Sequence, residues 1–290
     1  MNNKPTYLHV KDHSVSGEEF QLLYNDELDM LETYPQPKSE KLSEYYKSED
    51  YISHTDTKRN LLEKVYHVVR VISLKRKMKL INSFVLKSST ANKRTLLDIG
   101  CGTGDFLETA QKDNWQISGI EPNKNARQIA NSKTNNSVFE IEHLANLKAN
   151  SFDVITLWHV LEHLPNLEMH TNVFKHLLKP NGTLVIAVPN FKSYDAEYYK
   201  NFWAAYDVPR HLWHFSKTSI KELFKKENMV LMKTLPMTFD SYYVCLLSEK
   251  YRSGFMNPIK AFWIGWRSNL KAKRTKEYSS HIYVLKHQNS

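Results

Sequence analysis

Two hydrophobic periods alternate along most of the chain, one typical of strands and one typical of helices. Apolar runs predict five successive strands: TLLDIG, QISGIE, SVFEIE, FDVITLW and TLVIAVP. Segments with helical spacing lie between them: GDFLETAQKDN, NKNARQIANSK, HVLEHLPN and NLEMHTNVFKHLL, with a KPNG turn before the last strand. This alternation predicts an α/β fold in which crossover helices connect parallel strands of a doubly wound sheet.

The segments beyond this alternation complete the predicted organisation. Residues 56–82 predict an amphipathic helix at the start of a core that runs to residue 239. KTSIKELFKKENM predicts a further helix, and VLMKTLPMT and HIYVLKH predict two late strands. Residues 1–55 are interpreted as an extended arm with short helical pieces, 240–278 as a helical insertion, and 279–290 as the last strand of the core.

Composition indicates where in the cell the protein works, but it leaves several classes of binding partner open. The 290 residues carry a net charge of +9, which suits nucleic acid, an acidic membrane surface, an anionic substrate or a basic solvated surface. Two cysteines exclude a disulfide framework, so we expect a cytoplasmic protein. The N-terminus lacks the apolar core of a secretory signal, and no apolar stretch is long enough to span a bilayer.

A glycine-rich loop after the first core strand is the most specific chemical signal. Asp98, Gly100, Gly102 and Gly104 form an acidic G-x-G-x-G loop, unlike the G-x-G-x-x-G of dinucleotide sites or the lysine-containing loop of nucleotide triphosphatases. An acid in the loop would repel a pyrophosphate and favours a ligand with a positive group. Glu121, at the end of the second strand, is placed to accept hydrogen bonds from ribose hydroxyls.

The motifs LLDIGCGTG, GIEPN, FDVITLWHVLEHL and LLKPNGTLVIAVPN resemble those of class I S-adenosylmethionine-dependent methyltransferases, over about residues 94–235. The resemblance is greatest to the small-molecule branch that includes ubiquinone-pathway O-methyltransferases. It implies a Rossmann-like seven-stranded sheet with an antiparallel last strand, and S-adenosyl-L-methionine as the cofactor. The cofactor contacts expected on this basis are Asp98, Gly100, Cys101, Gly102, Glu121, Pro122, Trp158 and His159, with Glu142 or His143 at the adenine.

Histidines near strand ends are the candidate proton acceptors. His159 ends the fourth strand, and Glu162 and His163 follow at helical spacing. His163 also suits a packed structural role, whereas a metal site made of His159, Glu162 and His163 lacks a clear further ligand, so we assign no metal. His211 is a third candidate base, with His214 as its alternative.

Two aromatic segments have open interpretations. Residues 194–216 are either a substrate-covering loop, with Arg210 meeting an anionic group, or a hydrophobic cluster packed on the sheet. The N-terminal 13–37 resembles the leader of relatives that carry a cysteine zinc ribbon, but the cysteines are absent and we expect no zinc. Tyrosines of 44–54 are expected to pack over the cofactor or substrate cleft.

The insertion places Ile259, Phe262, Trp263 and Trp266 on one helical face, with Lys and Arg after them. That face is interpreted as a lid or core element, a peripheral membrane contact through 255–274, or a homodimer contact. The whole pattern predicts methyl transfer to an oxygen of a small-molecule or lipid-like acceptor. An RNA methyltransferase and a non-catalytic cofactor-binding scaffold are the alternatives, although no recognised RNA-binding module accompanies the core, and we expect no DNA partner.

Overall fold

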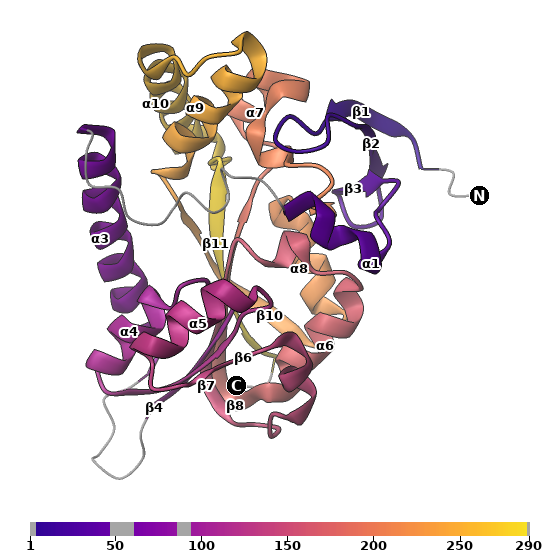
Figure 1. Ribbon diagram of the computed structural model, residues 1–290. Coiled ribbons are helices and arrows are strands. Elements are labelled where there is room, and N and C mark those ends of the chain that lie inside the picture. The colour runs from indigo at the N-terminus through magenta and orange to yellow at the C-terminus, as the bar shows by residue number, and fades with distance from the viewer. Residues whose placement is uncertain (1–3, 47–60, 86–93, 289–290) are drawn as a thin grey trace.

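A seven-stranded sheet forms the centre of the computed structural model, which describes residues 4–46, 61–85 and 94–288 (Figure 1). In spatial order the strands are β10 (Met229–Pro236), β11 (Ser280–His287), β8 (Leu178–Pro189), β7 (Phe152–Trp158), β4 (Arg94–Ile99), β5 (Trp115–Ile120) and β6 (Val138–Phe139). β11 runs antiparallel to both neighbours, while the other pairs in this sheet are parallel. The predicted mostly parallel sheet with an antiparallel last strand is confirmed.

Helices cover both faces of this sheet, which explains why its strands are apolar without alternation. One layer is α3 (Leu61–Asn82), α4 (Asp105–Lys112) and α5 (Lys124–Lys133); the other is α6 (Leu167–Leu177) and α8 (Lys217–Lys225) (Figure 1). The neighbouring residues Leu96 and Leu97 are both fully buried, yet each belongs to a different core cluster. The doubly wound architecture is therefore a three-layer sandwich with a core on each side of the sheet.

The N-terminal segment differs from the prediction of an extended, helical arm. It forms a second, four-stranded antiparallel sheet: β1 (Thr6–Lys11), β2 (Glu19–Asn25), β3 (Met30–Tyr34) and the distant β9 (Trp213–His214). Phe20 and Leu22 alternate with more exposed residues along β2 and face the interior. The strand signal is weak in sequence because each run has only five to seven residues. The short α1 (Ser39–Leu42) and the 3₁₀ turn η1 (Ser43–Tyr46) follow, and most of 44–54 lies outside the described residues.

The predicted helical insertion before β11 is confirmed as two helices, α9 (Asp240–Ser253) and α10 (Pro258–Thr275). They pack beside α7 (Tyr194–Tyr199) at the end of the molecule opposite α4 and α5 (Figure 1). Among the described residues, no helix is both long and apolar enough to cross a bilayer.

Three local predictions need correction. HVLEHLPN contains only the single 3₁₀ turn η3 (Leu161–His163), because His159 and Asn166 on either side adopt left-handed backbone conformations. The predicted turn at 179–182 lies inside β8. The 194–216 stretch is not an open loop: it contains α7, η4 (Lys200–Phe202), η5 (Ala204–Tyr206) and β9, and its aromatic side chains join a core cluster with β1 and β2. The alternative of a packed hydrophobic cluster is the correct one.

Candidate functional site

The candidate site lies at the carboxyl edge of the three central strands. β7, β4 and β5 are neighbours, so the segments after them meet at one edge. The glycine loop follows β4, Glu121 follows β5, and His159 follows β7. The loop is tied to the next strand because the backbone N–H groups of Gly100 and Cys101 donate to the Ile120 carbonyl, at 2.7 and 3.1 Å.

The glycines of the loop have different roles. Gly100, Gly102 and Gly104 have φ angles of +67°, +55° and +80°, a left-handed region that favours glycine. A Cβ on Gly100 would lie 2.4 Å from the Val160 side chain, so this position is closed by packing. A Cβ on Gly102 would have no described atom within 4 Å. Gly102 therefore presents bare backbone toward open space, as a ligand cradle requires.

Two buried carboxylates flank this cradle. Asp98 is 2% exposed and accepts a 2.6 Å hydrogen bond from the Thr156 hydroxyl. Burial raises the pKa of Asp98 to about 7, against the opposing effects of Thr156 and Lys77. Glu121 accepts hydrogen bonds from the backbone N–H groups of Gly102 and Asn123, at 2.8 and 2.9 Å, and burial raises its pKa as well. A positively charged ligand would stabilise both carboxylates.

Lys77, on α3, is a site residue that the sequence analysis missed. Its Nζ lies 4.2 Å from the centre of the Trp158 ring. Burial lowers the pKa of Lys77, whereas the charges of Asp98 and Asp240 raise it. Trp158 also packs edge-on against Phe106 at 5.7 Å between ring centres, so its ring lies on the α3 side of the sheet.

His159 is held in an unusual backbone conformation by two acids. Its φ is +57°, rare for a residue with a side chain and often found where function requires it. Nε2 lies 2.9 Å from Oδ2 of Asp240, and Nδ1 lies 3.4 Å from Oε1 of Glu162. Burial lowers the pKa of His159, but the bond to Asp240 and the charge of Glu162 outweigh it and raise the pKa to about 10. His159 is thus a cation at neutral pH, which argues against it as the general base.

Asp240 is the second residue that sequence reasoning missed. It begins the inserted helix α9, far from His159 in sequence, and only the fold brings the two together.

Beyond His159, Glu162, His163 and His211 form a buried polar cluster. One ligand atom from each lies within 4.8 Å of the others. His211 Nδ1 lies 2.9 Å from the Ala205 carbonyl, and His163 Nδ1 lies 3.1 Å from the Arg210 carbonyl. Because a carbonyl can only accept, we assign a proton to Nδ1 of each ring.

Glu162 is 1% exposed, and its carboxylate contacts the His159 ring at 3.4 Å without a hydrogen bond of normal geometry among the described residues. Burial raises its pKa, but His159, His211 and His163 lower it and prevail. Burial and the neighbouring His211 lower the pKa of His163 to about 4, so this ring is neutral at pH 7. A carboxylate oxygen and two imidazole nitrogens can accept a proton or hold a divalent cation.

The N-terminal part closes this cluster from outside. The Tyr46 hydroxyl lies 3.0 Å from His163 Nδ1, whereas the Tyr45 hydroxyl donates to Glu18. Tyr51 lies outside the described residues, so packing of the tyrosine-rich segment over the cleft stays a prediction. Arg210, in contrast, is not free for a substrate anion. Its guanidinium donates to Asp12 and Asp207 at 2.9 and 2.8 Å and is 6% exposed.

The remaining predicted residues occupy separate places. His214 is buried; its Nε2 lies 3.0 Å from the Thr33 hydroxyl, and its ring centre is 6.4 Å from that of His211. His143 stacks on Phe139 at 4.1 Å between ring centres beyond β6, and Glu142 is exposed beside it. Pro122 is exposed directly after Glu121. The residues expected at the adenine therefore lie next to the strand that follows the expected ribose acid.

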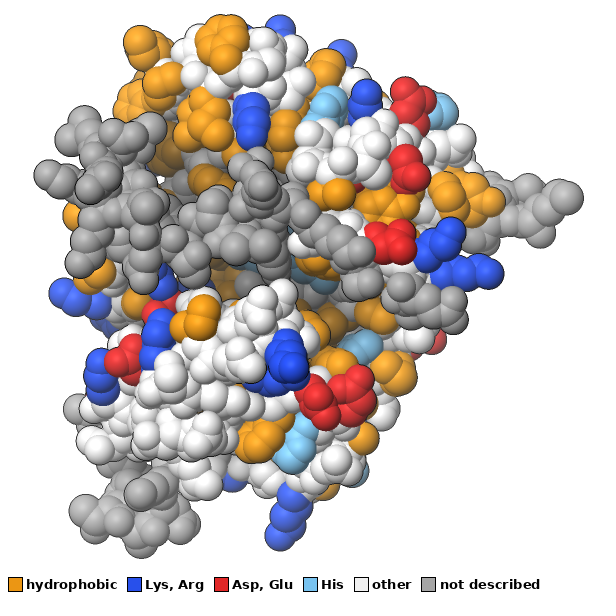
Figure 2. All heavy atoms as spheres, viewed as in Figure 1, with side chains coloured by type: hydrophobic (Ala, Val, Ile, Leu, Met, Phe, Trp, Pro, Cys, Tyr) orange, Lys and Arg blue, Asp and Glu red, His pale blue; other side chains and the backbone are white. Residues whose placement is uncertain are grey.

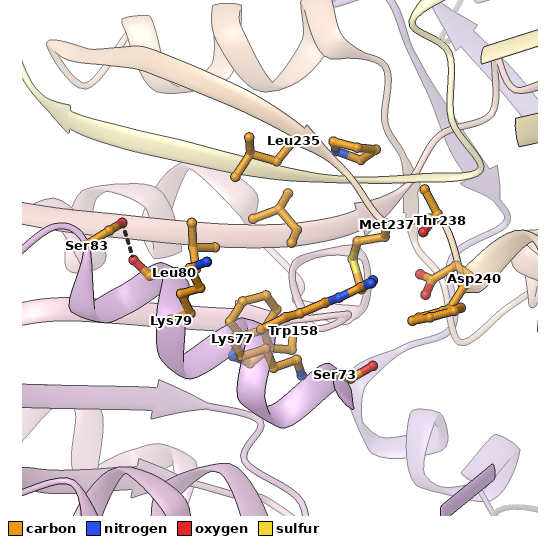
Figure 3. A pocket seen from close by; sticks show the side chains of 14 residues that line it. Ser73, Lys77, Lys79, Leu80, Ser83, Trp158, Leu235, Met237, Thr238 and Asp240 are labelled. Carbon is orange, nitrogen blue, oxygen red and sulfur yellow. Dashed lines mark hydrogen bonds between the residues drawn. The ribbon is translucent and has the colours of Figure 1, made fainter. Parts of the chain in front are cut away.

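An elongated cavity of about 370 Å³ opens between α3 and the end of β10. In Figure 3, Leu80 and Ser83 lie at one end, Thr238 and Asp240 at the other, and Lys77 and Trp158 between them. Its lining is mainly apolar, with lysine and arginine side chains of α3 along one wall. Asp240 both lines the cavity and contacts His159, so the cavity reaches the edge of the candidate site.

Comparison with known proteins places these features in a family. A family model described as a methyltransferase domain matches residues 72–233, more than half of the chain. A ubiquinone biosynthesis O-methyltransferase of Nitrosococcus oceani is 34% identical over 110 residues, covering 36% of this chain and 46% of that protein. The corresponding Azoarcus protein is 27% identical over 157 residues, covering 47% and 67%. The chain spans about half the length of most of the curated relatives it matches.

Solved structures show the same fold at low identity. Magnesium protoporphyrin IX methyltransferase of Synechocystis, with bound S-adenosylhomocysteine, has a TM-score of 0.55 and 12% identity, covering 86% of this chain and 100% of that one. Phosphoethanolamine N-methyltransferase 2 of Haemonchus contortus, in complex with S-adenosyl-L-methionine, has a TM-score of 0.51 and 17% identity, covering 73% and 52%.

Proposed function

The chain belongs to the class I S-adenosyl-L-methionine-dependent methyltransferases, and on that premise we propose that it methylates an oxygen of a small-molecule or lipid-like acceptor. The observation that carries the proposal is the mainly apolar cavity that ends at Asp240, which His159 connects to the buried cluster of Glu162, His163 and His211. An apolar acceptor fits such a cavity. A hydroxyl group that receives the methyl group must lose its proton, and the cluster of Glu162, His163 and His211 could accept that proton.

The residues of the glycine loop fit the cofactor. Gly102 leaves the cradle open, and Asp98 and Glu121 supply buried carboxylates for a positively charged ligand with ribose hydroxyls. When bound, S-adenosyl-L-methionine supplies a methyl group already activated by a sulfonium. The task of the protein is then to align the acceptor and exclude water. We propose that Asp98 and Gly102 hold the methionine half, that Glu121 holds the ribose, and that His143 contacts the adenine.

The histidines divide the remaining work. His159, protonated and bound to Asp240, positions the inserted helix against the site. His163, whose ring is neutral at pH 7, and His211 each place a ring nitrogen within 4.8 Å of a Glu162 carboxylate oxygen, so we propose them as the bases for the acceptor proton. Glu162 stabilises the imidazolium that proton uptake would create, because its carboxylate is buried beside both rings.

Labelled methyl transfer tests the proposal. The full chain is incubated with S-adenosyl-L-methionine labelled in the methyl group and with three acceptor pools: cell RNA, cell lipid and a small-molecule extract. We expect label in the lipid or small-molecule pool. If the acceptor is a hydroxyl, the product is a methyl ether, and the label should remain attached after treatment with base. Label only in RNA would overturn the acceptor class. Tight donor binding without label in any pool would favour a non-catalytic scaffold.

Variants connect that assay to the site. Asp98→Asn should weaken donor binding, because it removes the charge beside the glycine loop. His163→Gln should retain donor binding and lower the turnover rate at neutral pH, where the parent ring is a neutral acceptor, and the difference from the parent should shrink as pH falls toward 4. A matched control is His176→Gln on α6, a histidine outside the site. Equal effects of the His163 and His176 changes would contradict the assigned role.

A further inference from the structure

Helix α10 buries small residues and exposes large apolar ones, the reverse of the usual arrangement in a surface helix. Its buried positions are all small residues, Ala261, Gly265, Ser268 and Ala272. Five of its large apolar residues point to solvent: Ile259, Phe262, Trp263, Trp266 and Leu270 are 74%, 58%, 59%, 42% and 46% exposed, whereas Ile264 packs against a core cluster. A helix usually buries its large apolar side chains against the core. Here the exposed face is the more hydrophobic one.

The buried face of α10 is fully used by the protein. A Cβ on Gly265 would lie 2.9 Å from the Tyr242 ring, so α9 and α10 approach closely through small residues. Ser268 donates a 2.6 Å hydrogen bond to the buried Asp195 of α7. The helix cannot turn its aromatic face inward without losing these contacts. The exposed face is therefore a fixed property of the fold.

The exposed face continues beyond α10. Phe255 and Met256, in the turn before the helix, are 61% and 45% exposed, and Tyr243 of α9 is 49% exposed. Figure 2 shows hydrophobic side chains gathered over the end of the molecule that α9 and α10 form. We call Phe255, Met256 and the five exposed apolar residues of α10 the aromatic face. A cluster of this kind on a described surface marks an interaction site.

The positive charge beside the aromatic face favours an anionic partner. Between residues 252 and 276 the sequence has seven Lys or Arg residues and no Asp or Glu. Arg267, Lys271 and Arg274 follow each other at spacings of four and three, so they form a basic stripe on one flank of the helix. Lys271 and Arg267 lie over the Tyr194 ring at 3.8 and 5.5 Å, which fixes the direction of that stripe.

We propose that the aromatic face and its basic stripe bind an anionic lipid bilayer, with α10 lying in the plane of the interface. Aromatic side chains favour the boundary between lipid tails and headgroups, and each nearby Lys or Arg strengthens binding to anionic lipid about fivefold. A second copy would bring a surface with the same excess of positive charge, whereas an anionic bilayer brings the opposite charge. The bilayer therefore fits both the apolar and the charged part of the surface.

This surface is joined to the candidate site through α9, whose first residue, Asp240, contacts His159 and lines the cavity. Bilayer binding would bring the cavity to the surface where apolar acceptors are dissolved. The inference about the bilayer nevertheless needs neither donor nor acceptor, so it stands or fails independently of the proposed reaction.

Vesicle co-sedimentation tests the proposal with the full chain. The probes are vesicles of phosphatidylcholine mixed with phosphatidylglycerol, and vesicles of phosphatidylcholine alone. We expect binding to the mixed vesicles at about 0.1 M salt, weaker binding at about 0.5 M, and weak binding to phosphatidylcholine at either. Absence of binding to the mixed vesicles at the lower salt overturns the proposal.

Paired variants separate the aromatic and charged contributions. Trp263→Ser with Trp266→Ser should lower vesicle binding at least tenfold, whereas Met169→Ser with Met232→Ser, which are exposed apolar residues elsewhere, should leave it unchanged. Lys271→Gln with Arg274→Gln should lower binding at least tenfold, and Lys148→Gln with Lys221→Gln should have little effect.

Folding and oligomeric state are measured on the same variants. Because the replaced side chains are exposed, circular dichroism and thermal unfolding should match the parent protein. Sedimentation velocity should give the same species for the parent and the tryptophan variant. A parent dimer that the tryptophan changes convert to a monomer would assign the face to a second copy and overturn the bilayer proposal.

Discussion

A comparison of Gly102→Ala with Gly254→Ala separates the steric effect of an added methyl group on cofactor binding from its effect on backbone strain. Both glycines are left-handed, with φ of +55° and +81°, and a Cβ on either would have no described atom within 4 Å. Gly254 ends α9 and lies outside the candidate site. The two substitutions therefore add the same methyl group under the same backbone penalty, and they differ only in what faces that methyl group.

The expected magnitudes follow from these surroundings. A left-handed alanine costs about 1 kcal/mol, which should lower the melting temperature of each variant by about 2–4 °C. At Gly102 the methyl group would also occupy the space expected for the methionine half of the donor. We expect donor affinity to fall at least tenfold, about 1.4 kcal/mol, in Gly102→Ala alone. The backbone N–H at this position still donates to Glu121, so loss of that bond does not explain the effect.

Thermal unfolding and calorimetric titration with S-adenosylhomocysteine provide the two readouts. Gly100→Ala is the steric contrast: its Cβ would lie 2.4 Å from Val160, so it should lower the melting temperature clearly more than the other two changes. If Gly102→Ala binds the nucleoside as tightly as Gly254→Ala does, the cradle does not face the donor. An equal loss of affinity in both would assign the effect to general destabilisation.

Three further predictions concern the ionised groups. Burial raises the pKa of Asp98 to about 7, so the affinity for the cationic donor should increase with pH between about 6 and 8, and calorimetry should find this dependence absent in Asp98→Asn. Asp240→Asn should lower the pKa of His159, which histidine proton NMR titration measures; an unchanged titration would show that the contact does not set the charge. Arg210→Met leaves the Asp12 carboxylate buried without its partner and should cost about 3–5 kcal/mol in denaturant unfolding. Burial raises the pKa of Asp12, but Arg210 and the backbone donors lower it by more, so the net pKa of Asp12 lies below its ordinary value. The stability it contributes is therefore present above the unfolded-state pKa of about 3.9 and is lost as pH falls through the folded value, and Arg210→Met should flatten that acid limb.

The parts of the fold with long-range periodicity were predictable from sequence. The strands of the large sheet are buried on both faces, so their apolar runs stand out, and the order of the motifs placed Asp98, Glu121 and His159 at one edge. The N-terminal sheet was missed because short strands leave a weak alternation and because its fourth strand, β9, comes from far along the chain.

Asp240 and Lys77 could not be found for a related reason. Each lies on a helix whose sequence carries no motif, and the approach of α3 and α9 to the ends of β4 and β7 decides their role. The periodicity of α10 correctly predicted an apolar face, but it did not show whether that face packs against the core or is exposed to solvent. The small residues Ala261 and Gly265 give the missing signal, since they allow the close helix contact that directs the large residues outward.

The pairing of β3 with β9 has a consequence for how the chain folds as it is synthesised. Asp12 and its partner Arg210 are separated by 198 positions, so the early strands emerge about 10–40 s before the residues that complete their sheet. Through that interval the hairpin is a nascent structure with an unpaired edge and an unneutralised carboxylate. His163 takes its backbone acceptor from Arg210, so the histidine cluster also assembles late in translation. The earliest segment of this protein is thus among the last to reach its native state.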